Sequence, residues 1–183
     1  MEIPALSSYI RRKDMDSVLN CMVSDKLAPG DYVEKLQKLI RERLDWDFSL
    51  PLRSPVVALG VAMDVLGLRT GDAVGVPALA PVWVARALEL RGLSPVWLDA
   101  DPDSASLSAD FRDRLAAGGA KALFLAQPWG LMADPAALRD LGIPVVEDVS
   151  TALGASAGDV KAGQLGTFAL LGMEHASSLT AGG

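Results

Sequence analysis

Lys121-Ala-Leu-Phe-Leu-Ala126 is the stretch that decides the fold of this 183-residue chain. Its residues Ala122-Leu-Phe-Leu-Ala126 make both faces of a strand apolar, as in a parallel strand that helices cover on both sides. Short apolar runs bounded by Gly and Pro predict further strands at residues 47–52, 73–76, 96–98, 144–147 and 167–171, with helices at 55–66, 81–90, 107–116 and 135–141. This alternation predicts an α/β fold, a three-layer α/β/α sandwich with a mainly parallel sheet of about six strands.

The first 45 residues have a different pattern, with two helices expected at residues 14–24 and 31–44 and no strand between them. Each helix carries an apolar stripe at helical spacing, which a short helical pair cannot bury by itself. The sequence therefore predicts a helical N-terminal arm, residues 1–45, an α/β domain, residues 46–183, and a homodimer that covers the stripes.

Charge and composition argue against several classes of partner. The net charge is −6 and no basic stripe is available for phosphates, so we expect no nucleic-acid partner. The longest apolar stretch, residues 56–68, is interrupted by Asp64 and is too short to span a bilayer. The single Cys21 excludes an internal disulfide, and the opening residues do not resemble a signal peptide, so we expect a cytoplasmic protein without membrane insertion.

Three candidate positions stand at or after expected strands. Ser54 before Pro55 is typical of a helix start, or of a weak anion site, since Pro55 lacks an N–H. The pair Glu147-Asp148 closes an apolar strand, so Asp148 is a candidate partner for a ligand cation or protonated ring nitrogen, or a cap of the next turn. His175 is the only histidine of the sequence, and we interpret it as an ordinary loop residue or as a catalytic base. One His and one Cys predict no metal site.

Six motifs, taken in order, resemble the DegT/DnrJ/StrS family of pyridoxal-phosphate-dependent sugar aminotransferases. They are Leu27-Ala-Pro-Gly-Asp-Tyr-Val33, Ser54-Pro-Val-Val-Ala-Leu59, Leu66-Gly-Leu-Arg-Thr-Gly-Asp72 with Val76-Pro77, Pro95-Val-Trp-Leu-Asp99, Gln127-Pro-Trp-Gly130 with Asp134, and Val146-Glu-Asp148 with Gly154-Ala155. The resemblance implies the large domain of a pyridoxal-phosphate-dependent transferase, with the family's C-terminal domain absent.

The resemblance implies roles for some residues and losses at others. Asp148 is expected to bind the pyridine nitrogen of the cofactor, and Ser54 lies in the phosphate turn, where Pro55 and Val56 replace the family's Gly and Thr. The ring-stacking aromatic falls near Pro81. The Schiff-base lysine is missing before residues 179–183, since the last lysine of the chain is Lys161.

We therefore expect a degenerate aminotransferase-like domain, inactive as a transaminase, with a binding or association role. No tightly bound cofactor is expected, although pyridoxal phosphate is a candidate ligand. The alternative is a pyridoxal-phosphate-dependent sugar aminotransferase or dehydratase with His175 in place of the lysine. A third interpretation is that a second aminotransferase-like chain supplies the missing half.

Overall fold

The computed structural model describes residues 9–24, 30–174, 177 and 179–181. The Cα positions divide the chain into two compact units, Met1–Arg53 and Ser54–Gly183. The segment 46–53, which the sequence assigns to the α/β domain, groups with the first unit.

The first unit contains the two expected helices, α1 (Arg12–Met22) and α2 (Asp31–Leu44). Neither helix has a buried residue, and the stripe on α1 is exposed throughout, with Val18 and Leu19 at 59% and 57%. The stripe on α1 is therefore uncovered among the described residues, whereas Leu36, Ile40 and Leu44 of the stripe on α2 are half-buried.

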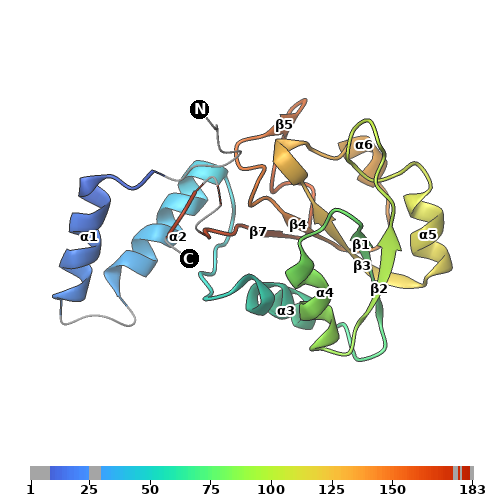
Figure 1. The fold of residues 1–183 in the computed structure, drawn as a ribbon, viewed down its shortest axis with the longest axis horizontal. Coiled ribbons are helices and arrows are strands. Elements are labelled where there is room, and N and C mark those ends of the chain that lie inside the picture. The colour runs from blue at the N-terminus through green and yellow to red at the C-terminus, as the bar shows by residue number, and fades with distance from the viewer. Residues whose placement is uncertain (1–8, 25–29, 175–176, 178, 182–183) are drawn as a thin grey trace, which may run out of the picture. The chain divides into compact units, whose positions relative to one another are not determined.

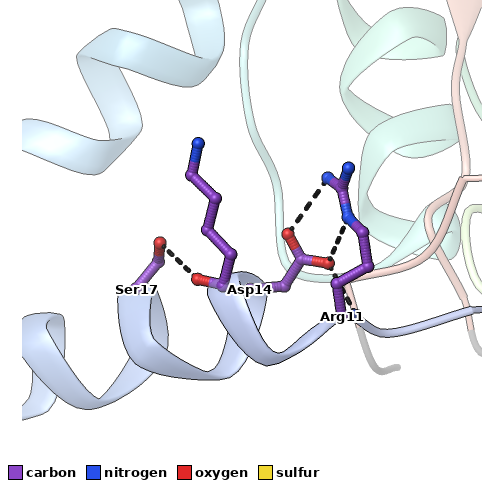
Figure 2. A network of polar contacts seen from close by, with 4 residues as sticks. Arg11, Asp14 and Ser17 are labelled. Atoms are coloured by element: carbon purple, nitrogen blue, oxygen red, sulfur yellow. Dashed lines mark hydrogen bonds and ion pairs between the residues drawn. The ribbon is translucent and has the colours of Figure 1, made fainter.

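The start of α1 is organised by one carboxylate (Figure 2). Asp14, in the first turn, accepts hydrogen bonds from the backbone N–H of Arg11 at 2.9 Å and from its Nε at 3.3 Å, and these bonds lower the pKa of Asp14. In the next turn the Ser17 hydroxyl donates to the carbonyl of Lys13. Asp14 thereby places a negative charge at the positive end of the helix dipole.

The prediction of a strand at residues 47–52 is wrong, because this segment has no regular secondary structure. Its alternating apolar residues do not face a core, since Phe48 and Leu50 are 88% and 67% exposed. Ser49 instead bonds to α2 through two hydrogen bonds with Gln37. Pro51 also lacks the N–H that a strand ladder requires.

The second unit is built on a five-stranded sheet in the order β2-β1-β3-β4-β7, with every neighbouring pair parallel. This confirms the parallel sheet, with five of the six expected strands. They are β1 (Ala73–Pro77), β2 (Ser94–Leu98), β3 (Ala120–Ala126), β4 (Val145–Asp148) and β7 (Phe168–Leu170). A small antiparallel hairpin, β5 (Ser156–Ala157) and β6 (Val160–Lys161), stands outside this sheet.

Helices cover both faces of the sheet, as the apolar strand 121–126 predicts (Figure 1). Ala122 and Phe124 of β3 pack on one face with α3 (Pro55–Val65) and α4 (Val82–Glu89). Leu123 and Leu125 pack on the other face with α5 (Phe111–Ala117) and α6 (Pro135–Leu138). The three-layer α/β/α sandwich is confirmed.

Close packing under α5 depends on one glycine. A Cβ on Gly75 of β1 would lie 2.2 Å from Cδ2 of Leu115, so a larger residue at this position would require the Leu115 side chain to move. None of the described helices is both long and apolar enough to cross a membrane.

Candidate functional site at the carboxyl ends of the strands

The candidates Asp148 and Ser54 lie at one end of the sheet, where the carboxyl ends of its five parallel strands meet. Asp148 is the last residue of β4, and Gln127 follows β3 beside it. Helix α3 packs on the sheet and its C-terminal end leads into the start of β1, so its N-terminus at Ser54 lies at the same edge. In such sheets this edge is where ligands bind.

Asp148 is buried, with 7% of its surface exposed. It lies two residues after Val146, and therefore on the sheet face that α3 and α4 cover. Its Oδ1 accepts hydrogen bonds from the backbone N–H of Ser150 at 3.0 Å and from the Ser150 hydroxyl at 2.5 Å. Oδ1 therefore caps the turn, as the alternative interpretation predicts, and no described residue donates to Oδ2.

Ser150 is a residue that the sequence reasoning missed. Its hydroxyl donates to Asp148 and accepts a hydrogen bond of 2.7 Å from the backbone N–H of Gly172, which follows β7. The local signal was present, because an Asp side chain commonly accepts from the backbone two residues on. The link to Gly172 is a tertiary contact that no local pattern encodes.

The electrostatic setting of Asp148 favours its protonated form. Burial raises the pKa of Asp148, the hydrogen bonds from Ser150 act in the opposite direction, and the charge of Glu174 raises the pKa further. A positively charged group next to Oδ2 would relieve this cost. The site therefore suits a cationic ligand group.

We expect the Asp148→Asn substitution to stabilise the ligand-free protein in a pH-dependent way. The raised pKa means that folded Asp148 keeps its proton above 3.8, where the unfolded side chain loses it, so stability falls as the pH rises through this window. Asn stays neutral and still offers Oδ1 to Ser150. Urea unfolding of both proteins should show a stabilised variant at neutral pH and a shrinking difference as the pH falls toward 3.8. A difference that does not change with pH would contradict this.

The neighbouring Glu147 faces the opposite side of the sheet and is completely buried. Its carboxylate accepts from the Gln127 amide nitrogen at 3.1 Å and from the backbone N–H groups of Gly163 and Leu165 at 2.9 and 3.0 Å. The Gln127 side-chain oxygen in turn accepts from the backbone N–H of Ala133. Glu147 therefore ties the loops after β3 and β6 to β4, and it has a structural role rather than a binding one.

Ser54 occupies the start of α3, as the sequence indicates. It is the N-cap residue with Pro55 at the first helical position, and its hydroxyl makes no capping hydrogen bond to the helix. The first turn offers the backbone N–H groups of Val56 and Val57, but Pro55 has none. The helix start can bind an anion, with fewer donors than a complete first turn would have.

Pro81, near which the resemblance places the stacking aromatic, is the N-cap of α4. The nearest aromatic on this helix, Trp83, packs into the core instead. Its ring meets that of Phe124 edge-on, with a centroid distance of 5.9 Å.

Neither lysine of the second unit, Lys121 or Lys161, forms a hydrogen bond or ion pair with Asp148 in the described part of the chain. Lys121 forms an ion pair of 2.6 Å with Asp72 at the beginning of β3, about 16 Å of strand from the end that pairs with Asp148. Lys161 is exposed on the hairpin strand β6. His175, the candidate base, lies outside the described residues.

Neither Asp148 nor Ser54 lines the cavity beside α6. It has a volume of about 810 Å³ and is open to solvent, between the loop at 101–111, residues 132–139 and the β5–β6 hairpin. The acidic side chains that line it form hydrogen bonds within the chain, since Asp101 accepts from Ser104 and Asp134 caps α6. The described residues also include no cluster of three or more metal-ligating side chains.

The fold and the strand-end site define a class, because solved aminotransferases share this architecture along nearly the whole chain. An aminotransferase from Psychrobacter cryohalolentis superposes with a TM-score of 0.86 at 20% identity, covering 97% of this chain and 47% of that one. Helicobacter pylori PseC, an aminotransferase involved in the biosynthesis of pseudoaminic acid, gives 0.87 at 17% identity, covering 98% and 50%. The fold is that of the pyridoxal-phosphate-dependent aminotransferases.

A sequence profile of the DegT/DnrJ/EryC1/StrS aminotransferase family matches residues 8–182, and the chain belongs to that family. The L-glutamine:2-deoxy-scyllo-inosose aminotransferase of Streptomyces fradiae is 33% identical over 141 residues, which cover 74% of this chain and 33% of the relative. The GDP-perosamine synthase of Caulobacter vibrioides is 26% identical over 182 residues, covering 93% and 49%. The chain thus spans between a third and a half of the length of these relatives.

Proposed function

We propose that this chain is a degenerate aminotransferase-like domain that binds pyridoxal phosphate, or a related pyridine, noncovalently and is inactive as a transaminase. The observation that carries the proposal is the contrast between a retained ring-nitrogen partner and an absent amine. Asp148 is buried at the strand edge with Oδ2 free of partners among the described residues, whereas residues 162–183 contain no lysine.

The residues fit the two ends of the cofactor unequally. The Asp148 carboxylate fits a protonated ring nitrogen, because its charge stabilises the proton there. The Ser54 hydroxyl and the N-terminus of α3 fit the phosphate, but with one donor fewer because Pro55 has no N–H. When bound, the cofactor supplies an electron-withdrawing ring; Asp148 orients that ring and Ser54 holds its anionic end.

The substrate class rests on the relatives alone. Their names describe an inosose aminotransferase and a GDP-perosamine synthase, so we propose that any second ligand is a keto-sugar or keto-cyclitol. The dehydratase or aminotransferase alternative through His175, and its completion by a second chain, stay predictions. The expected homodimer through the helices of the first unit and the cytoplasmic location also stay predictions.

The test is a titration of the full chain with pyridoxal phosphate, followed by absorbance and then by borohydride reduction and mass spectrometry. We expect saturable binding with the spectrum of the free aldehyde form and no reduced adduct on a specific lysine, since a covalent link needs an amine at the aldehyde carbon. Asp148→Ala should weaken binding by about 10- to 100-fold, the loss of one charged hydrogen bond.

The matched control is Asp103→Ala, which removes an exposed loop carboxylate and should leave the affinity unchanged. A borohydride-stable adduct on one lysine that Asp148→Ala abolishes would overturn the noncovalent reading. The absence of any binding would overturn the cofactor proposal as a whole.

A further inference from the structure

Ser150 joins two segments that are far apart in the sequence. It follows β4 by two residues, and Gly172 follows β7 by two residues. The backbone N–H of Gly172 donates to the Ser150 hydroxyl at 2.7 Å, and that hydroxyl donates to Asp148 Oδ1 at 2.5 Å. Because a hydroxyl has a single proton, the bond from Gly172 favours the orientation in which this proton points at Asp148.

The same carboxylate oxygen also accepts the backbone N–H of Ser150. Two donors on Oδ1 fix the rotation of the carboxylate and leave Oδ2 without a described partner. An orientation fixed before binding lowers the entropy that a ligand must lose to bind.

We propose that Ser150 is a positioning residue of this site, whose hydroxyl, oriented by the Gly172 backbone, fixes Asp148 so that Oδ2 meets the cationic group of the ligand. The ligand itself rests on the proposed function, but the orienting of Asp148 does not. The chain Gly172–Ser150–Asp148 also links the Asp148 carboxylate to the segment that carries Glu174, whose charge acts on Asp148.

Gly172 offers an independent way to disturb the same hydrogen bond. A Cβ at this position would lie 2.8 Å from the Ser150 hydroxyl oxygen, closer than side chains tolerate. Gly172→Ala should therefore displace the hydroxyl from Asp148 without changing Ser150 or Asp148 themselves.

The decisive measurement is a carbon-13 NMR titration of the Asp148 carboxyl in the ligand-free full chain. Ser150→Ala and Gly172→Ala should both raise the pKa of Asp148 further, because each removes a hydrogen bond that favours the charged form. Ser150→Thr, which keeps a hydroxyl, should restore the original titration. The charge of Glu174 also raises the pKa of Asp148, and Glu174 is unchanged in all these variants.

The matched control is Thr151→Ala in the same turn, whose hydroxyl donates to the Gln127 carbonyl and not to Asp148. It should leave the Asp148 titration unchanged. In a pyridoxal phosphate titration, Ser150→Ala should lose about 10-fold in affinity while Thr151→Ala keeps it.

The outcomes distinguish the positioning role of Ser150 from the proposed binding of pyridoxal phosphate. A folded Ser150→Ala protein whose Asp148 titrates as in the wild type would overturn the positioning role. If the wild type fails to bind pyridoxal phosphate, the proposed function falls, and the ligand-free titration still decides the role of Ser150.

Discussion

Replacing Glu147 by leucine should lower the free energy of unfolding by about 3 kcal/mol or more, because each buried donor left without an acceptor costs about 1 to 3 kcal/mol. The reason is the number of donors that lose their acceptor. The Gln127 amide and the backbone N–H groups of Gly163 and Leu165 all donate to this carboxylate, which is completely buried. Urea denaturation monitored by circular dichroism measures the loss.

The exposed Glu89 provides a matched control for the same substitution. Its ion pair with Arg86 involves side chains that are 68% and 63% exposed, so Glu89→Leu should cost less than about 1 kcal/mol. Glu147→Gln should fall between the two, because one acceptor oxygen remains while the new amide opposes a donor. Equal effects at positions 147 and 89 would show that the buried network contributes little.

The second large effect is expected at Phe124, where substitution by alanine should cost about 3 to 5 kcal/mol of unfolding free energy. Phe124 is completely buried in β3 and meets Trp83 of α4 edge-on, so the substitution leaves a cavity between sheet and helix. The near-ultraviolet circular dichroism signal of the folded variant should also change, because the cavity alters the environment of Trp83.

Phe48→Ala is the control, since Phe48 is 88% exposed and its removal should change stability by less than about 0.5 kcal/mol. A Phe124→Ala protein as stable as this control would show that the α3–α4 face of the sheet is not well packed.

The central strands were predictable because their environment is uniform. Residues 121–126 are apolar on both faces, and a strand of this kind has no stable place except between two helical layers. The prediction of a strand at residues 47–52 failed because the environment of this segment is not uniform. Phe48 and Leu50 alternate with polar residues as in a half-buried strand, but this alternation does not reveal whether a partner strand exists.

The site was predictable only in part. Asp148 follows from its place at the end of an apolar strand, and Ser54 from the helix-start pattern Ser-Pro. The contacts of Ser150 with Gly172 and of Glu147 with Gly163 join segments that the fold brings together from different loops. Such pairs depend on the register of several strands, which no local pattern contains.

The parallel arrangement of the sheet also has a consequence for how the chain folds. No two neighbouring strands of β2-β1-β3-β4-β7 form a hairpin, so each ladder requires the closure of a long loop before its first hydrogen bond forms. Such non-local pairing slows folding. The three-residue strand β7 at the edge adds the fewest bonds, so hydrogen exchange should be fastest there, and each opening would briefly release Gly172 from Ser150.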